Sequence, residues 1–134
     1  MVSVKQRLVG SSGLRVSELG LGTGTWGVGA GQEEAQVMLR MFLDAGGTLI
    51  DSSPAYGHGR SQEVLASVLA DAALPRSAYV LSSSAGVAPD SPVGRRVDCS
   101  RRTLMQQLDE TLRVLGTDHL DLWSVGYWDE KTPP

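Results

Sequence analysis

The sequence predicts an α/β fold built around a parallel β-sheet. Four short apolar segments have the length and composition of buried strands, namely residues 18–22, 48–51, 78–84 and 119–125. Three longer segments between them carry apolar residues at helical spacing, namely residues 32–45, 62–70 and 101–115. No hairpin signal separates successive strands from residue 18 onward. Strands and helices that alternate in this way form parallel sheets with right-handed crossovers.

A small β-hairpin precedes the alternating segments. Residues 4–9 and 14–18 flank the sequence Gly-Ser-Ser-Gly at 10–13. Glycine and serine favour tight turns, so we expect two short antiparallel strands here.

Small polar residues and glycines mark the expected helix ends. Ser61 and Ser100 are suited to cap the second and third helices, because a serine hydroxyl accepts a hydrogen bond from a free N–H of the first turn. Gly46 and Gly116 follow the first and third helices and accept the left-handed conformation of a helix end. Glycines and prolines within residues 86–99 predict a long loop.

Length and composition indicate one soluble globular domain. The chain has 134 residues, and we expect a single domain over 1–134, with the hairpin in 1–17 and the alternating elements in 18–134. The net charge of −3 argues against a nucleic-acid partner. No segment has the apolar length of a signal peptide or a membrane span, and Cys99 is the only cysteine. We therefore expect a cytoplasmic protein with no membrane partner.

A glycine-rich loop follows the first strand of the sheet. Gly22, Gly24 and Gly27 match the spacing of a dinucleotide-binding turn. That turn requires a helix to begin among the glycines, whereas the expected helix begins near Gln32. A loop over a pocket, with Trp26 as its lid or wall, is the favoured interpretation.

A polar cluster follows the second strand of the sheet. Asp51, Tyr56 and His58 lie close in sequence and offer a carboxylate, a phenol and an imidazole for proton transfer. Each also has a structural alternative, because these side chains can simply hold a loop or line a pocket. His119 lies at the opposite end of its strand, so we expect a structural role. No spacing typical of a metal site occurs.

Four stretches of the chain together resemble the N-terminal half of the aldo-keto reductase family. They are LRVSELGLGTGTWG, FLDAGGTLIDSSPAYGHGRSQEVL, SRRTLMQQLDETLRVLGTDHLDLW and YWDEKTP. The resemblance implies half of a (β/α)8 TIM barrel, with four parallel strands that alternate with three helices after an N-terminal hairpin. In such barrels the active site lies at the carboxyl ends of the strands.

The resemblance also implies a catalytic tetrad of Asp, Tyr, Lys and His, of which this sequence keeps two members. Asp51 and Tyr56 match the first two, while the Lys position is Ser84 and the His position is Gly126. Without a cation nearby, a tyrosine whose ordinary pKa is about 10 is poorly activated at neutral pH, and an adjacent carboxylate disfavours its phenolate further. Loss of one positioned acid–base group costs about two to four orders of magnitude in rate. We expect little reductase activity.

The resemblance implies NADPH as the family's cofactor and places it near Thr23, Gly24 and Asp51. The family holds the pyrophosphate and adenine ribose mainly with loops of the second half of the barrel, and a complete barrel needs about 250 residues. We therefore expect no cofactor on one chain, and NADPH only where another chain completes the site.

An isolated half-barrel would expose two sheet edges and an apolar face, which proteins generally cover. We expect a homodimer, or else a protein partner. Trp26, Tyr127 and Trp128, with Ser84, could line a pocket for a small-molecule substrate, although the aromatic residues could equally pack in the core or an interface. Asp129 is expected to orient a loop.

Three functions remain open from the sequence. The favoured one is a small-molecule enzyme that has lost hydride transfer and uses Asp51, Tyr56 and His58 for isomerisation, dehydration or cyclisation of a carbonyl compound. The second is an NADPH-dependent carbonyl reductase completed by oligomerisation. The third is a non-catalytic auxiliary or regulatory subunit. The chain could also be a fragment of a longer product, but two separate tetrad substitutions favour a diverged protein.

Overall fold

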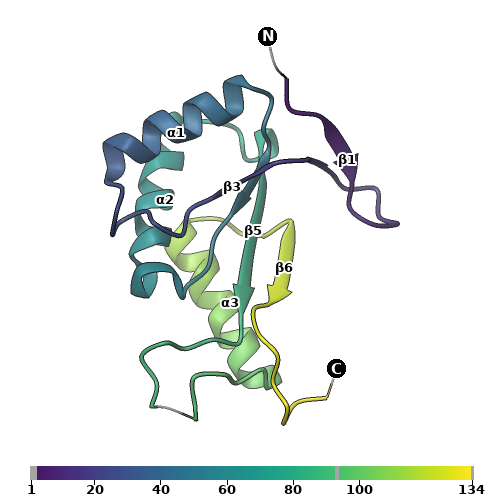
Figure 1. Ribbon diagram of the computed structural model, residues 1–134, viewed down its shortest axis with the longest axis vertical. Helices are drawn as coiled ribbons and strands as arrows, with labels where there is room; N and C mark the ends of the chain where they lie inside the picture. The colour runs from purple at the N-terminus through teal and green to yellow at the C-terminus, as the bar shows by residue number, and fades with distance from the viewer. Residues whose placement is uncertain (1–2, 93, 134) are drawn as a thin grey trace.

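The computed structural model describes residues 3–92 and 94–133, and a parallel sheet of four strands forms its centre (Figure 1). The strands lie in the order β3 (Gly20–Gly22), β4 (Leu49–Asp51), β5 (Val80–Ala85) and β6 (Leu122–Val125). Each strand pairs in parallel with its neighbour. The predicted parallel sheet is therefore confirmed, although β6 begins at Leu122 rather than at His119.

The predicted N-terminal hairpin is present at the amino end of the sheet. β1 (Gln6–Leu8) pairs antiparallel with β2 (Arg15–Ser17). The Ser17 hydroxyl accepts hydrogen bonds from the N–H groups of Thr48 (2.9 Å) and Leu49 (3.1 Å). These bonds attach the hairpin to the start of β4, away from the carboxyl end of β4, where Asp51 lies and which Tyr56 and His58 follow.

Three helices form where the apolar spacing predicts them: α1 (Gln32–Asp44), α2 (Arg60–Ala72) and α3 (Arg101–Leu115). Two short 3-10 turns, η1 (Tyr56–Gly59) and η2 (Arg76–Ala78), precede α2 and β5. None of the helices in the described part of the chain has the length and apolarity needed to cross a membrane.

The helix ends confirm three of the four expected caps. The Ser100 hydroxyl accepts a hydrogen bond from the Thr103 N–H at 3.4 Å, and Gly46 (φ 85°) and Gly116 (φ 64°) adopt the left-handed conformation. Ser61 does not cap α2, since that helix begins at Arg60. Its buried hydroxyl donates to the Thr23 carbonyl oxygen at 2.6 Å, because the start of α2 packs against the loop that follows β3.

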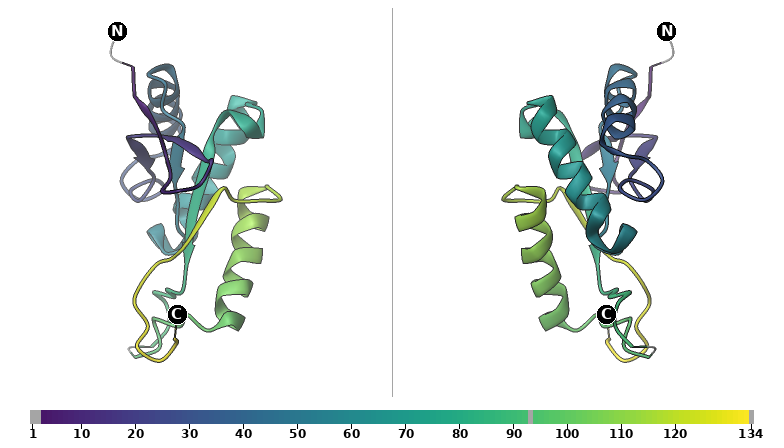
Figure 2. Two further views of the ribbon diagram at one scale, coloured as in Figure 1. Left: turned by 90° about the vertical axis from the view of Figure 1, so that its right-hand side faces the viewer. Right: turned by 90° about the vertical axis from the view of Figure 1, so that its left-hand side faces the viewer.

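The helices cover one face of the sheet and leave the other open. Figure 2 shows α2 and α3 on one side of the strands. Ile50 and Leu81 point to that side and pack with Leu65 of α2, and all three side chains are almost completely buried. On the opposite face Ser82 and Ser84 are half-buried and Ser124 is exposed. No helix of residues 3–92 and 94–133 packs on this open face.

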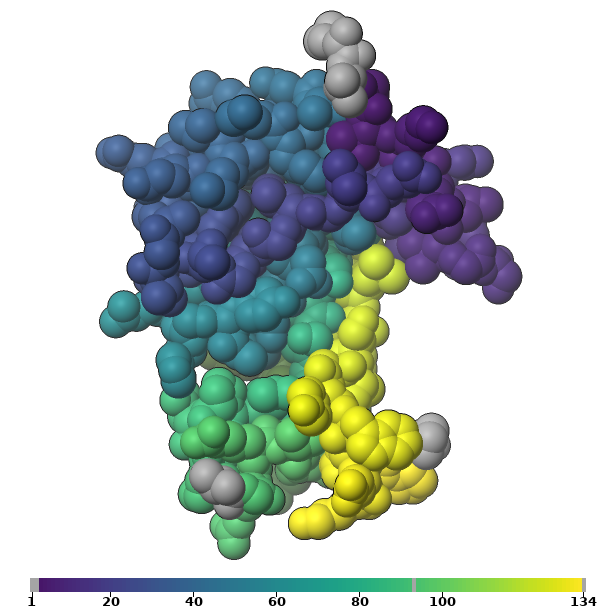
Figure 3. Space-filling model, in the orientation of Figure 1, coloured from purple at the N-terminus to yellow at the C-terminus, as the bar shows by residue number. Residues whose placement is uncertain are grey.

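The edge strand β6 carries exposed apolar side chains. Trp123 pairs with Ser83, and Val125 pairs with Ala85, so these two side chains lie on the helix-facing side of the sheet. They are nevertheless 38% and 56% exposed. The C-terminal residues continue from this edge as a strip along one side of the molecule (Figure 3).

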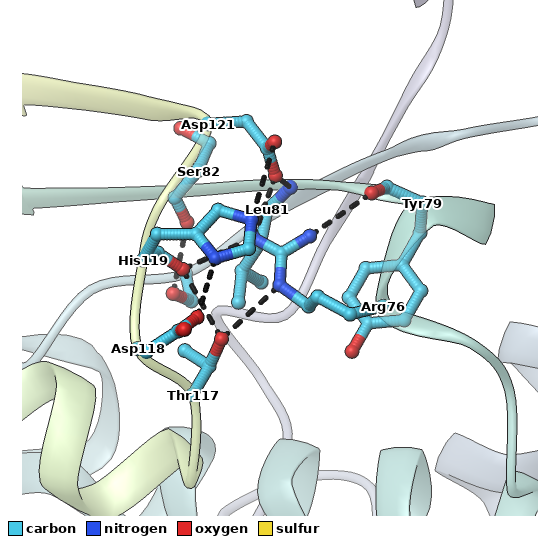
Figure 4. Close-up of polar contacts among 9 residues, drawn as sticks. Arg76, Tyr79, Leu81, Ser82, Thr117, Asp118, His119 and Asp121 are labelled. Carbon is cyan, nitrogen blue, oxygen red and sulfur yellow. Dashed lines mark hydrogen bonds and ion pairs between the residues drawn. The ribbon is translucent and has the colours of Figure 1, made fainter.

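A second group of polar residues, at the amino ends of β5 and β6, holds these two strands together (Figure 4). The Arg76 guanidinium donates to the Asp121 carboxylate (2.7 Å) and to the carbonyl oxygens of Tyr79 (3.2 Å) and His119 (3.1 Å). The same Asp121 carboxylate accepts the Leu81 N–H at 2.8 Å. His119 thus contributes its backbone at this end of the sheet, which agrees with the expected structural role.

Asp121 keeps its charge although it is largely buried. Burial alone would raise the pKa of the carboxyl, but the hydrogen bonds from the Leu81 N–H and the Arg76 guanidinium outweigh burial and lower this pKa. A group with a depressed pKa in the folded state stabilises the protein above its unfolded pKa and loses that contribution as the pH falls.

We expect the substitution Asp121→Ala to lower the free energy of unfolding at pH 7 by about 2 kcal/mol, because it leaves Arg76 and the Leu81 N–H without their acceptor. The difference from the parent protein should shrink as the pH falls below about 4. Urea unfolding at several pH values measures both effects. Glu110→Ala is the matched control, because Glu110 forms an exposed pair with Arg113 and should cost less than about 1 kcal/mol. Equal losses for the two variants would contradict the prediction.

Candidate functional site

Asp51 is the centre of a hydroxyl-rich site at the carboxyl end of β4. Its carbonyl oxygen accepts hydrogen bonds from the Thr23 hydroxyl (2.9 Å) and the Thr23 N–H (3.3 Å), which fix the backbone. Its carboxylate accepts the Tyr56 hydroxyl on one oxygen (3.0 Å) and the Ser82 hydroxyl on the other (3.1 Å). Ser82 lies opposite Asp51 in the β4–β5 register, so strand pairing itself creates the second contact.

A tight turn after β4 returns Tyr56 to Asp51. The Ser52 hydroxyl donates to the Ser82 carbonyl oxygen at 2.9 Å, and the Ser53 hydroxyl accepts the Ala55 N–H at 3.2 Å. His58 then adopts a positive φ of 54°, a conformation that few non-glycine residues take up. The local hydrogen bonds thus bring a residue five positions along the chain to the carboxylate.

Ser84 and Gly126 lie side by side where the resemblance implies Lys and His. The Ser84 hydroxyl donates to the Ser53 hydroxyl at 3.2 Å. The Gly126 N–H donates to the Ala85 carbonyl oxygen at 2.7 Å. A Cβ atom at Gly126 would lie 3.2 Å from that oxygen and 3.3 Å from the Ser84 hydroxyl oxygen, so a side chain would fit only if these neighbours shift slightly.

The site carries negative charge without a positive partner. In the part of the chain that the structure describes, no ion pair joins Asp51 to a Lys, Arg or His side chain. Burial raises the pKa of the Tyr56 phenol, and the hydrogen bond to Asp51 and its negative charge raise this pKa further. Tyr56 is therefore held as a neutral hydrogen-bond donor at physiological pH.

A buried polar layer supports the site from the helix side. The Gln62 side chain donates to the Ser83 hydroxyl at 3.2 Å and reaches the Ser52 hydroxyl at 3.5 Å. All three residues are buried. Sequence reasoning missed this layer, but a signal existed: Gln62 is a polar residue on the helix face that also carries Leu65 and Leu69.

His58 does not join the Asp51–Tyr56 pair. Its side chain is 66% exposed, and its Nδ1 atom lies 2.6 Å from an Asp90 carboxylate oxygen in the long loop 86–99. This pair connects two loops at the rim of the site, and a catalytic role for His58 stays a prediction without a contact to support it.

Trp26 and Thr23 do not face an open pocket, and both predictions need correction. Trp26 is completely buried in the hydrophobic core. The turn that contains it is closed by hydrogen bonds from the N–H groups of Gly29 (2.7 Å) and Ala30 (3.0 Å) to the Thr25 carbonyl oxygen, which fold the indole inward. Thr23 is also completely buried, with its hydroxyl committed to Asp51 and Ser61, so it is not available to a cofactor.

The C-terminal segment places two aromatic side chains beside the long loop. Tyr127 and Trp128 are 64% and 72% exposed. Asp129 accepts the Cys99 N–H at 2.9 Å and the Thr132 hydroxyl at 2.7 Å, which confirms that it orients a loop. The aromatic residues are thus held near the strand ends, and their contact with substrate stays a prediction.

The three residues that the resemblance places near NADPH differ in accessibility. Thr23 is buried, and each carboxylate oxygen of the half-buried Asp51 accepts one hydroxyl donor. Only Gly24 is open, with no atom within 4 Å of the position that its Cβ would take.

The parallel sheet, the one-sided helix layer and the polar site at the strand ends define a barrel-type α/β protein. Residues 18–134 match the Aldo/keto reductase family, and the chain belongs to that family. A solved structure described as an aldo-keto reductase from Pseudomonas aeruginosa superposes with a TM-score of 0.76 at 35% identity, over 90% of this chain and 45% of that one. The chain therefore has the fold of half a (β/α)8 barrel.

Two curated relatives are similar to this chain in sequence. Aldo-keto reductase YhdN of Bacillus subtilis (strain 168) is 28% identical over 129 residues, which are 93% of this chain. L-galactose dehydrogenase of Arabidopsis thaliana is 28% identical over 125 residues, or 91% of this chain. The matched region is 38% of the length of each relative.

We expect Asp51→Asn to lower the pKa of Tyr56, because the substitution removes the negative charge that disfavours the phenolate and weakens the hydrogen bond that holds the phenol neutral. A pH titration followed by the 13C resonance of the Tyr56 ring ζ-carbon measures the shift. Asp90→Asn is the control, since Asp90 bonds to His58 at the exposed rim and should leave Tyr56 unchanged. An unchanged or higher Tyr56 pKa in Asp51→Asn would contradict the electrostatic description of the site.

Proposed function

We propose that this protein catalyses proton transfer on a small carbonyl compound without hydride transfer. The observation that carries the proposal is the Asp51 carboxylate, held by the Tyr56 and Ser82 hydroxyls with no ion-pair partner in the described chain. A positioned carboxylate beside a neutral phenol offers a base and a hydrogen-bond donor. Isomerisation, dehydration and cyclisation are reactions that such a pair can serve.

In the proposed mechanism Asp51 removes a proton from the carbon next to the carbonyl group. The electrons of that C–H bond form a carbon–carbon double bond, and the carbonyl π electrons move to oxygen. The Tyr56 hydroxyl turns from Asp51 to that oxygen and stabilises the enolate by a hydrogen bond. Asp51 then returns the proton to a neighbouring carbon or to the oxygen, so the reaction needs no oxidant or reductant.

The two missing tetrad members favour this chemistry over carbonyl reduction. Serine at position 84 supplies no charge that would lower the pKa of Tyr56, and Gly126 has no side chain that could polarise a carbonyl. A phenol with a raised pKa is a weaker general acid than a phenol beside a cation, but it can still donate a hydrogen bond to an enolate. Ser84, Tyr127 and Trp128 are the proposed contacts to the rest of the substrate.

We also propose that a second copy of the chain covers the β6 edge. Trp123 and Val125 are exposed on the side of the sheet that helices cover elsewhere, and the backbone of an edge strand invites pairing. A dimer would shield these residues from solvent. The second copy would also form one side of the open face on which Asp51 lies.

We expect Asp51→Asn and Tyr56→Phe each to lower proton-transfer activity by about two to four orders of magnitude, because the first removes the base and the second removes the hydrogen bond to the enolate oxygen. The assay follows deuterium incorporation next to the carbonyl of dihydroxyacetone, cyclohexanone and phenylacetaldehyde in D2O by 1H NMR. Asp90→Asn serves as the control and should keep the parent rate.

Two outcomes would contradict the proposal. Exchange that is equally fast in the parent protein and both site variants would remove Asp51 and Tyr56 from the chemistry. Exchange or carbonyl reduction that appears only with NADPH, together with saturable quenching of NADPH fluorescence, would favour a reductase completed by association.

We expect the parent protein to elute as a dimer in size-exclusion chromatography with light scattering, and Val125→Lys to shift it to the monomer, since a buried lysine at the edge disfavours pairing. Leu8→Lys in β1 is the control, because Leu8 is 47% exposed at the opposite end of the sheet and Val125 is 56% exposed. A parent protein that is monomeric at about 100 μM, well above the dissociation constant of a stable dimer, would contradict this prediction.

A further inference from the structure

We infer that the Asp51 site binds a primary ammonium group, so that its substrate is an amine-bearing carbonyl compound. This inference names the substrate class for the site of the proposed function and rests on that function for its catalytic meaning. It follows from the charge of the site, from its arrangement of oxygen atoms, and from the short residues Ser84 and Gly126 beside it.

The charge of the site is unbalanced. Asp51 is half-buried, and its carboxylate is held by two neutral hydroxyl groups rather than by a cation. The partly buried carboxylate of Asp121 is instead compensated by its ion pair with Arg76. A partly desolvated carboxylate without a cation attracts one from solution, because desolvation strengthens the attraction between opposite charges.

The oxygen atoms around Asp51 match the donors of an ammonium group. A primary ammonium carries three N–H donors and no acceptor. Asp51 supplies carboxylate lone pairs, and the Ser82 and Ser84 hydroxyls project from the same face of β5, two residues apart. The Ser84 hydroxyl donates a hydrogen bond to the Ser53 hydroxyl. These side chains therefore form a row of oxygen atoms that contains no cationic donor.

The open face at Ser84 carries short side chains. Successive side chains on one face of a strand are separated by about 6.5–7 Å, which a lysine at position 84 would span to reach Asp51. Serine is several atoms shorter, and its neighbour Gly126 has no side chain. We therefore place the ammonium group of the ligand on this side of Asp51.

A bound ammonium would also change Tyr56. The negative charge of Asp51 is one cause of the raised pKa of this phenol. A cation beside Asp51 offsets that charge and strengthens the phenol as a hydrogen-bond donor to the carbonyl oxygen of the same ligand. The substrate would then supply the positive charge that position 84 lacks.

The test uses n-butylammonium chloride as the probe and two-dimensional 1H–15N NMR of the full chain at pH 7. We expect saturable shifts of the backbone signals of Asp51, Ser82 and Ser84 at constant ionic strength. Tetramethylammonium has the charge without N–H donors, and n-butanol has the chain without the charge, so neither should cause saturable shifts there.

Two variants with opposite effects on charge sharpen the test. Asp51→Asn should weaken n-butylammonium binding by on the order of tenfold or more, because the charged acceptor is lost. Ser84→Lys should also abolish binding, because its own ammonium group fills the place. Glu63→Gln removes an exposed carboxylate on α2 and should bind like the parent. Near-identical amide spectra away from the site establish that each variant is folded.

Absence of saturable shifts in the parent protein would overturn the inference, and so would unchanged binding in Ser84→Lys. Failure of the proposed function gives a different result. Ammonium binding without deuterium exchange next to the carbonyl of aminoacetone, an amine-bearing substrate, would retain the amine site and reject proton-transfer catalysis. Exchange that depends on Asp51 without ammonium binding would retain the catalysis and reject the amine site.

Discussion

The register between β4 and β5 is the constraint on which the rest of the structure depends. It sets Asp51 opposite Ser82 and directs both side chains to the open face, while Ile50 and Leu81 point to the helices. A shift by one residue would bury the carboxylate and expose the core. The hydrophobic contacts of Leu65 with this pair therefore position the polar site as well as stabilise the fold.

The two ends of the sheet use polar groups for different purposes. At the amino end, the Arg76 guanidinium and Asp121 carboxylate neutralise each other and satisfy backbone groups of both strands. At the carboxyl end, Asp51 meets only hydroxyl groups, and its charge is left to act on Tyr56. The first arrangement stabilises the fold, whereas the second leaves electrostatic free energy that a ligand can use.

Local patterns predicted the fold well and the site only partly. Apolar spacing located the three helices, and turn chemistry located the hairpin, because both depend on neighbours in sequence. The contact of Tyr56 with Asp51 was implied by the family resemblance. Trp26 was misjudged because the fold-back of its own turn, which buries the indole, depends on tertiary packing that a glycine-rich sequence does not reveal.

Replacement of Lys by Ser at position 84 alters the site more than the loss of one side chain suggests. A lysine there would place a positive charge near Asp51 and Tyr56, which would lower the pKa of the phenol. With serine, the same carboxylate keeps its lone pairs, and Tyr56 remains protonated beside it. Serine at position 84 therefore leaves the pKa of Tyr56 raised, which suits the hydrogen-bond role proposed for this phenol. In the proposed reaction, the positive charge that position 84 lacks arrives with the substrate.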